Sequence, residues 1–348
     1  MKPRNLAIAA LVAVVGIVAV VWVVRGGADA KPLPGTPLRV LAKKRGLELG
    51  TAVRGDELKH NRAYRQLVAA QFSTVTPENE MKWAFVEPTR GQYEFGPADD
   101  IVKRAREAKQ KVRGHTLVWH FQLPGWVRKL GPKDLRQAMR EHIRNVVAHF
   151  ADDVGVWDVV NEPVSDGGGL RPSVFARRLG PGFIEDAFRT ARAADPDAKL
   201  YLNEIGAEGI NPKSNRLYEI VRGLKARGVP IDGVGFQTHT NLQGLPADFV
   251  ANMQRFRALG LDVAITEADV ALKVPPSPAD LQAQADIYAQ IVRSCLAVTC
   301  ASLTFWGYTD GRSWISETQA GMGAATLLDE ALRPKPGFYA VQKALAGG

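Results

Sequence analysis

The sequence has few cysteines and lacks several short motifs that identify common enzyme classes. Its 348 residues include two cysteines, Cys295 and Cys300, and a metal or redox site would need more such ligands or a different spacing. It contains no Gly-rich phosphate-binding loop, no G-x-S-x-G sequence and no H-E-x-x-H sequence, which argues against nucleotide, serine-hydrolase and zinc-protease chemistry. We therefore expect neither a metal nor a cofactor.

The chain also lacks clusters of positive charge. Its net charge is +9 at pH 7, but Lys and Arg are spread along the sequence, so nucleic acid is not expected as a partner. Hydrophobic residues make up 46% of the chain and charged residues 23%, which is typical of a globular protein with a sizeable core.

The first thirty residues resemble a targeting segment. Lys2 and Arg4 precede an uncharged run from Leu6 to Val24, which is long enough to span a bilayer as a helix. The stretch 28–30 has the A-x-A form of a cleavage site. Residues 1–30 are therefore either a signal peptide or an anchor that tethers the protein to the membrane through residues 6–24. Both readings place the protein outside the cytoplasm, secreted or held on the outer face of the cytoplasmic membrane.

The two cysteines lie five positions apart. In an oxidising compartment we expect Cys295 and Cys300 to form a disulfide that closes a small loop between a helix and the next strand. The alternative is a pair of buried free thiols.

From residue 38 onward, short apolar runs alternate with segments of helical periodicity. Residues 134–150 are typical of the second kind, and the prolines after Asn211 and Ser277 mark two further helix starts. The candidate strands are 47–53, 72–76, 111–119, 154–162, 199–204, 233–239, 261–267 and 301–307. Eight strand–helix units in a row predict the α/β class, with one (β/α)₈ TIM barrel over residues 38–348. Residues 31–37, with three prolines, are predicted to be a short stiff linker.

Polar and aromatic residues follow most of these strands, where a (β/α)₈ barrel places its chemistry. In chain order they are Glu78, Asn79, Lys82, His115, Trp119, Gln122, Asn161, Glu162, Gln237, His239, Glu267, Asp269, Trp306 and Trp314. Every tryptophan outside the hydrophobic N-terminal run lies in or beside one of these segments, and we interpret this distribution as a binding surface.

The stretch 157–163 holds the central carboxylate. Its apolar, β-branched residues predict a buried strand, which Pro163 ends because proline cannot continue the hydrogen-bonding ladder. Asn161 and Glu162 are adjacent, so they cannot both face inward on a regular strand. We therefore predict a bulge or an irregular ending at these two residues.

Two carboxylates among amides, imidazoles and flat aromatic rings suit the hydrolysis of a glycosidic bond. One carboxylic acid protonates the leaving oxygen, and a second carboxylate stabilises or attacks the anomeric carbon. Sugar rings stack their apolar faces on tryptophan, and their hydroxyl groups hydrogen-bond to Asn, Gln, Lys and His.

Five segments together carry a family signature. They are Thr76–Trp83, Arg113–His120, Trp157–Glu162, Gly235–His239 and Ile265–Glu267. In this order they resemble glycoside hydrolase family 10, the endo-β-1,4-xylanases, and the resemblance runs from about residue 47 to residue 345. It implies retaining hydrolysis of xylan by double displacement on a (β/α)₈ barrel, with xylan as the partner and no cofactor. We expect the protein to be a monomer.

The resemblance also implies a role for each matched residue. Glu162 matches the general acid/base, Glu267 the nucleophile, and Asn161 the residue that holds the sugar 2-hydroxyl. His239 matches the partner that keeps the nucleophile ionised, and Asp269 is either a support for His239 or a structural residue. The matches to sugar contacts on the glycone side are Glu78, Asn79, Lys82, His115, Trp119, Gln122, Gln237, Trp306 and Trp314.

The end of the fifth strand departs from the family. The family commonly has Tyr-Asn-Asp-Tyr there, whereas this chain has Leu202-Asn203-Glu204-Ile205. Ile205 replaces an aromatic residue that would stack a sugar, so binding on the aglycone side is expected to be weaker or differently shaped. Two alternatives stay open: a β-1,4-glucanase or cellobiosidase on the same scaffold, and a surface-anchored polysaccharide binder without catalytic activity.

Overall fold

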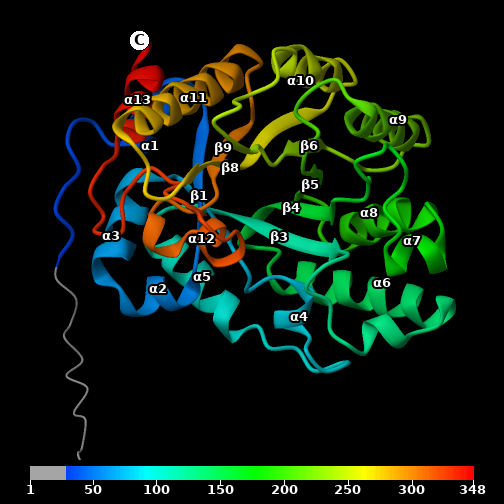
Figure 1. Ribbon diagram of the computed structural model, residues 1–348. Helices are drawn as coiled ribbons and strands as arrows, with labels where there is room; N and C mark the ends of the chain where they lie inside the picture. The colour runs from blue at the N-terminus through cyan, green and yellow to red at the C-terminus, as the bar shows by residue number, and fades with distance from the viewer. Residues whose placement is uncertain (1–28) are drawn as a thin grey trace, which may run out of the picture.

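The computed structural model describes residues 29–348, whose strands form a closed barrel (Figure 1). The barrel strands are β1 (Glu48–Val53), β2 (Thr74–Pro77), β3 (Lys111–Trp119), β4 (Val154–Asn161), β5 (Lys199–Glu204), β6 (Gly233–Phe236), β8 (Asp262–Lys273) and β9 (Ser302–Phe305). Each pairs in parallel with its neighbour, and β9 pairs with both β8 and β1, which closes the ring. The predicted (β/α)₈ barrel is confirmed.

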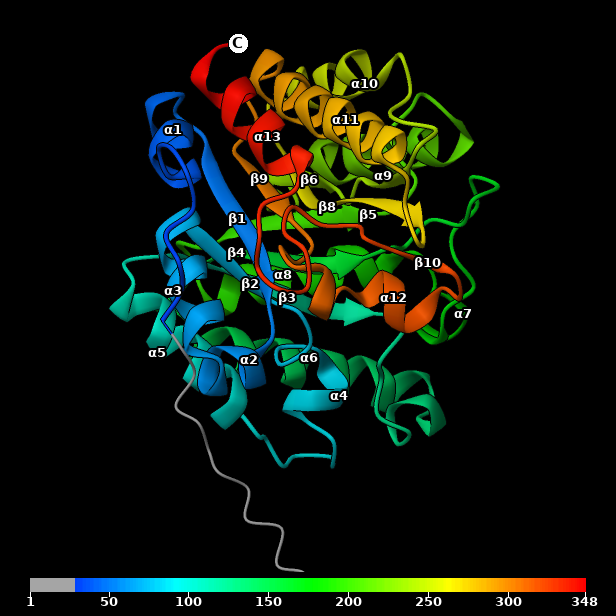
Figure 2. The ribbon, with the colours of Figure 1, turned by 60° about the vertical axis from the view of Figure 1, so that its left-hand side comes forward.

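Helices surround the barrel in chain order (Figure 1). They are α1 (Leu38–Lys44), α2 (Gly55–His60), α3 (Arg62–Gln71), α4 (Trp83–Val86), α5 (Gly96–Glu107), α6 (Pro132–His149), α7 (Val174–Leu179), α8 (Gly182–Ala194), α9 (Pro212–Ala226), α10 (Phe249–Arg257), α11 (Pro278–Ala297), α12 (Trp314–Thr318) and α13 (Pro336–Ala346). Short 3₁₀ turns cover Val127–Lys129 and Asp310–Arg312. The C-terminal helix α13 lies beside α11 and α1 (Figure 2), so the first and the last helix of the described chain are neighbours.

The helix signals in the sequence are confirmed. α6 buries one apolar face, which includes Leu135, Met139 and Ile143. The side chains of Asn211 and Ser277 cap α9 and α11 by accepting hydrogen bonds from backbone N–H groups three residues later, and a proline follows each cap. Such caps satisfy N–H groups that have no partner inside the helix.

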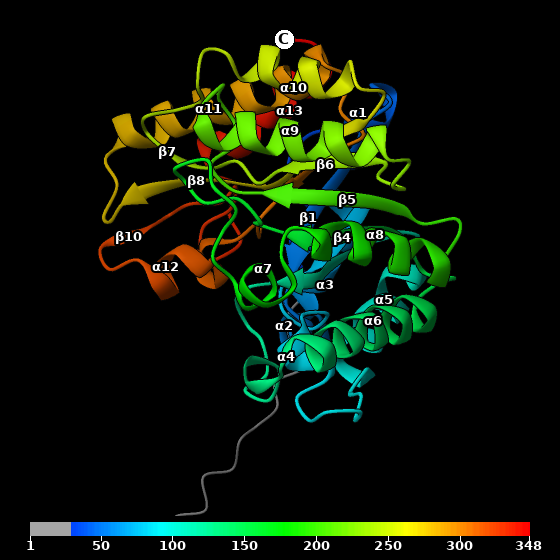
Figure 3. The ribbon, with the colours of Figure 1, turned by 90° about the vertical axis from the view of Figure 1, so that its right-hand side faces the viewer.

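Two predicted strands have different bounds in the structure. The sixth ends at Phe236, and a separate strand β7 (His239–Asn241) follows, because Thr238 has a φ of +64° that interrupts the extended backbone. The seventh does not end at residue 267, because β8 continues to Lys273 and pairs there with β7 and with β10 (Met322–Gly323). Figure 3 shows β8 running past the other strands toward β10 and α12.

The predicted disulfide between Cys295 and Cys300 is wrong, because both residues are buried free thiols. The Cys295 Sγ lies 3.7 Å from the carbonyl oxygen of Ser302, toward which it donates. Burial also raises the pKa of the Cys295 thiol well above its usual value. The thiolate needed for disulfide exchange is therefore scarce at this position.

The N-terminal hydrophobic run lies outside the described residues. Residues 29–37, which include the predicted linker, lie against the barrel: the Ala30 N–H donates to Gln66 (2.7 Å), and the side chain of Gln342 donates to the carbonyls of Pro34 and Thr36 (3.0 and 2.9 Å). Between residues 29 and 348, no helix has the length and apolar character to cross a membrane.

Candidate active site

A cleft of about 590 Å³ opens at the carboxyl ends of the barrel strands. It brings together the predicted site residues Glu78, Asn79, Lys82, His115, Trp119, Gln122, Asn161, Glu162, Gln237, His239, Glu267, Trp306 and Trp314. Asp269 lies behind the cleft and is buried. Ile205, the departure from the family at the end of β5, also lines the cleft.

The end of β4 turns two adjacent side chains into this cleft. β4 ends at Asn161, and Glu162 has a φ of +54°, so the predicted irregular ending is confirmed. The Glu162 N–H donates to the carbonyl of Asn203 (2.9 Å), and Arg171 donates to the Glu162 carbonyl (2.9 Å). These two bonds hold a backbone conformation that L-residues seldom adopt.

The Glu162 carboxyl is held by amides on one oxygen. Its Oε1 accepts from the side-chain N–H groups of Gln237 (3.1 Å) and Asn161 (3.3 Å), while Oε2 lies 3.9 Å from Nδ1 of His120. Burial lowers the pKa of His120 although the charge of Glu162 opposes this. Among residues 29–348, no Lys or Arg pairs with Glu162, which suits a group that gives and takes a proton.

The Glu267 carboxyl has the opposite environment. Its Oε2 lies 3.2 Å from Nε2 of His239, whose Nδ1 lies 2.9 Å from Asp269. Burial alone would lower the pKa of His239, but Asp269 and Glu267 raise it to about 10. Burial likewise works to raise the pKa of Glu267, but the hydrogen bond from His239 and the nearby imidazoles lower it. A charged His239 thus keeps Glu267 ionised. Asp269, which contacts this histidine, also accepts a hydrogen bond from the Trp314 indole (2.8 Å).

Asn203 joins the two carboxyl groups and has no role in the sequence prediction. Its amide nitrogen donates to Glu267 Oε1 (2.6 Å) and to Asn161 Oδ1 (2.9 Å), and its oxygen accepts from Thr266 (2.7 Å). Asn161 in turn contacts Glu162. Its position at the end of a predicted strand, beside Glu204, was the available signal in the sequence. The prediction for this segment concerned Ile205 only.

Asp158 is a second residue that sequence reasoning missed. It accepts from His115 (3.0 Å) and pairs with Arg113 inside the barrel, and the side chains of Asp158 and Arg113 are 1% and 4% exposed. Burial works to raise the pKa of Asp158, but Arg113 and His115 lower it. A charged residue in the middle of an apolar strand was the available signal, because such a residue needs a buried partner.

One wall of the cleft carries the polar groups that follow β2. The Asn79 oxygen accepts from Gln122 (3.0 Å) and Lys82 (3.3 Å), and the Lys82 ammonium lies 4.9 Å from the centre of the Trp119 ring. Burial raises the pKa of Glu78 to about 7, against the charges of Arg54 and Lys82. Amide, ammonium and indole groups on one wall match the polar rim and apolar face of a sugar.

The interpretation of all tryptophans as a binding surface is only partly right. Trp119, Trp306 and Trp314 line the cleft. Trp157, by contrast, is fully buried in the core, and Trp83 is buried in a stack against His142, with 4.0 Å between ring centres. Proximity to a motif in the sequence does not distinguish tryptophans that line the cleft from tryptophans that are buried in the core.

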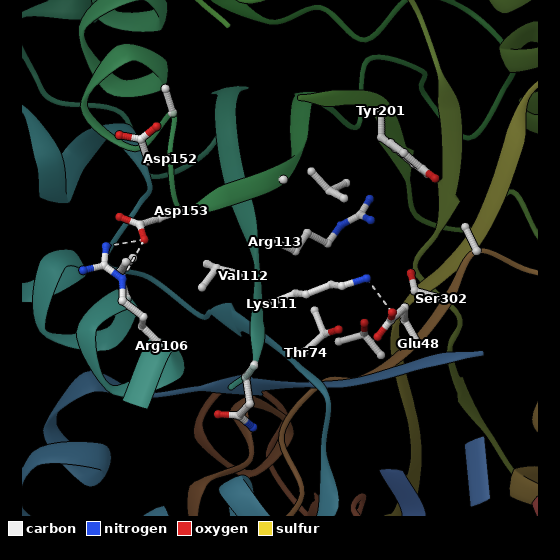
Figure 4. A pocket seen from close by; sticks show the side chains of 17 residues that line it. Glu48, Thr74, Arg106, Lys111, Val112, Arg113, Asp152, Asp153, Tyr201 and Ser302 are labelled. Carbon is white, nitrogen blue, oxygen red and sulfur yellow. Dashed lines mark hydrogen bonds and ion pairs between the residues drawn. The ribbon is translucent and has the colours of Figure 1, made fainter. Parts of the chain in front are cut away.

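A second hollow of about 520 Å³ lies at the opposite end of the barrel (Figure 4). Four of its charged side chains form two pairs: Lys111 lies 2.5 Å from Glu48, and Arg106 pairs with Asp153. None of the predicted site residues lines it.

Known proteins resemble this chain over almost its whole length. Residues 37–344 match the family described as Glycosyl hydrolase family 10. Endo-1,4-beta-xylanase B of Thermotoga neapolitana is 40% identical over 314 residues, 88% of this chain and 91% of the relative. Among solved structures, native xylanase 10B from Thermotoga maritima is 43% identical, with a TM-score of 0.87 over 89% of this chain and 98% of that one. Xylanase 10B from Thermotoga petrophila RKU-1, solved with xylobiose, is 42% identical, with a TM-score of 0.87 over 90% and 98%.

Proposed function

The chain belongs to glycosyl hydrolase family 10, and we propose that Glu162 and Glu267 carry out its reaction, the retaining hydrolysis of internal β-1,4-xylosidic bonds in xylan. The protein is an endo-1,4-β-xylanase. The observation that carries the assignment of residues is the contrast between the two carboxyls. Glu267 is held ionised by His239, whereas Glu162 is held by amides and lies near an imidazole whose pKa is lowered.

In the first step Glu162 protonates the glycosidic oxygen as the bond to the leaving sugar breaks. Glu267 attacks the anomeric carbon and forms a covalent glycosyl-enzyme. In the second step Glu162 removes a proton from water, the water oxygen bonds to the anomeric carbon, and Glu267 leaves as a carboxylate. The configuration at the anomeric carbon is retained because it is inverted twice.

The surrounding side chains prepare the two carboxyls for these steps. Because His239 is itself charged through its contacts with Asp269 and Glu267, it stabilises the carboxylate before the attack and after the release. Asn203 fixes Glu267 relative to Asn161, and the Asn161 amide is the group we assign to the sugar 2-hydroxyl. Such preorganised contacts lower the barrier without reorganisation during the reaction.

Two variants and one product measurement test this proposal. Glu162→Ala is expected to lose most activity on xylan, to keep the first step on aryl xylobiosides with good leaving groups, and to regain turnover with azide. Glu267→Ala is expected to be inactive on both substrates. Proton NMR of the first-formed product should show the β-anomer. An α-anomer would remove Glu267 from the role of nucleophile, and equal losses on every substrate in both variants would contradict the division of roles.

We also propose that residues 1–30 direct the enzyme out of the cytoplasm, either as a cleaved signal or as a membrane anchor. The uncharged run from Leu6 to Val24 supports this. N-terminal sequencing of the protein from cells distinguishes the two forms, because a start at Lys31 excludes the anchor. A protein found whole in the cytoplasmic fraction would contradict both.

A further inference from the structure

Two phenylalanines of this chain are exposed to solvent, and both line the catalytic cleft. Phe85 is 45% exposed and Phe121 is 62% exposed, and both belong to the cleft that contains Glu162 and Glu267. The other eleven of the 13 phenylalanines in the sequence are buried or half-buried. An exposed aromatic ring is a cost in water unless something covers it.

The two rings come from segments that are fastened to each other. Phe85 lies on α4 and Phe121 on the loop after β3, and the Ala84 N–H donates to the carbonyl of Gln122 (3.0 Å). Each residue of this bond is the chain neighbour of one of the two phenylalanines. The Phe121 ring also lies 5.7 Å from the Trp119 ring, measured between centres. The rings are thus held on a rigid support rather than on a free loop.

Their position in the cleft indicates which part of a substrate they meet. The same wall carries Asn79, Lys82 and Trp119, the residues that match sugar contacts on the glycone side. A phenylalanine ring has no hydrogen-bonding group, so it can only cover an apolar surface. The unsubstituted ring of a xylosyl unit offers such a surface, and it lacks the hydroxymethyl group that a glucosyl unit would have to place there.

We propose that Phe85 and Phe121 form a ledge that binds one further xylosyl unit of a long chain, on the glycone side beyond the two sugars that an aryl xylobioside supplies. This inference rests on the proposed function. The ledge gives the enzyme a preference for longer chains, because the additional stacking energy is available only to substrates long enough to reach it.

The test compares substrates of two lengths in Phe85→Ser, Phe121→Ser and the double variant. With xylohexaose, kcat/KM of the double variant is expected to fall roughly tenfold, a typical loss for one stacked ring. With an aryl β-xylobioside, kcat/KM should stay within about twofold of the wild type, which also shows that the variants are folded. Phe121→Tyr keeps the flat ring and should retain the preference for xylohexaose. Tyr339→Ser, which removes an exposed ring on α13 (46% exposed), is the matched control and should leave kcat/KM unchanged for both substrates.

Several outcomes overturn the ledge. The first is a double variant in which both kcat/KM values equal those of the wild type. The second is an equal fall of kcat/KM on both substrates, because that result would place the rings in a part of the cleft that both substrates use. A dimer that sedimentation detects in the wild type and not in the double variant, with the ratio unchanged, would assign the rings to a contact between copies. Failure of the proposed function is separate from these, because the wild type would then cleave neither substrate.

Discussion

The two ends of the barrel hold hollows of similar size, about 590 Å³ at the carboxyl ends of the strands and about 520 Å³ at the amino ends. Both contain carboxylates, but at the amino end Glu48 pairs with Lys111 and Asp153 with Arg106. At the carboxyl end, Glu162 has no Lys or Arg within salt-bridge distance among the described residues. What separates the two ends is therefore not the size of the hollow but the surroundings of Glu162 and Glu267, which contact amides and imidazoles rather than Lys or Arg.

The pair of Arg113 and Asp158 lies between the two ends. Arg113 lines the hollow at the amino end, while Asp158 accepts from His115, which lines the cleft. A charge pair at this depth replaces solvent for both partners, so each depends on the other. The buried pair of Arg113 and Asp158 therefore connects the hollow at the amino end with His115 in the cleft.

The largest expected difference between the ends is in activity. Glu267→Gln removes the proposed nucleophile and should lower kcat on xylan by at least about 10⁴-fold. Glu48→Gln makes the same chemical change at the amino end and should leave kcat within about twofold. Reducing-sugar release at saturating xylan measures both. A folded Glu48→Gln protein without activity would break the distinction between the two ends.

Stability should depend on how deeply a charge pair is buried. Arg113→Met leaves Asp158 buried without its cation and is expected to lower the free energy of unfolding by about 3–5 kcal/mol. Lys111→Met disrupts a pair whose side chains are 71% and 38% exposed, so its cost should stay below about 1 kcal/mol. Urea unfolding monitored by tryptophan fluorescence compares the two. An equal loss of unfolding free energy in Arg113→Met and Lys111→Met would mean that the buried pair stabilises the fold no more than the exposed pair does.

Asn203 tests whether the connection between the carboxyls matters for the rate. Asn203→Ala removes the amide that touches Glu267 and Asn161, and kcat is expected to fall about 10²-fold, with a smaller change in KM. Because Asn203 acts through Glu267, the pH profile of kcat should also shift. Thr304→Val, a buried change at the amino end, is the control and should leave kcat unchanged. A loss confined to KM would assign Asn203 to substrate binding alone.

The last comparison concerns how stability depends on pH. The pKa of His239 rises from 6.5 to about 10 on folding, so charged His239 stabilises the fold fully below about pH 6.5. This contribution is lost as the pH rises through 10. The difference in Tm between the wild type and His239→Asn should therefore shrink from pH 6.5 to pH 10. The difference for Thr304→Val should stay constant over the same range, since threonine does not titrate there. A difference in Tm between the wild type and His239→Asn that grows with pH would contradict the charged state of this histidine.

The sequence sufficed for the barrel and for most residues of the cleft, because both depend on patterns that are local in the chain. Strand and helix periods repeat eight times, and the polar residues follow the strands directly. The irregular ending at Asn161 and Glu162 was predictable too, since two adjacent residues cannot share one face of a strand.

What the sequence did not reveal depends on contacts between distant segments. Asn203 meets Glu267 across 64 positions, and Arg113 meets Asp158 across 45. The length of β8 follows from β7 and β10, two short strands that have no clear period of their own. The thiol state of Cys295 follows from a carbonyl group and from burial, neither of which is visible in the spacing of the cysteines.

The placement of Glu267 within β8 has a consequence for motion. Strand pairings flank Glu267, the proposed nucleophile, whereas Glu162, the proposed acid/base, lies one residue past the end of β4. Amide protons around residues 263–271 should consequently be among the slowest to exchange with deuterium, and those of residues 163–170 much faster. We therefore expect Glu267 to keep a fixed place through the cycle, and the segment that follows Glu162 to open locally more often than β8 does.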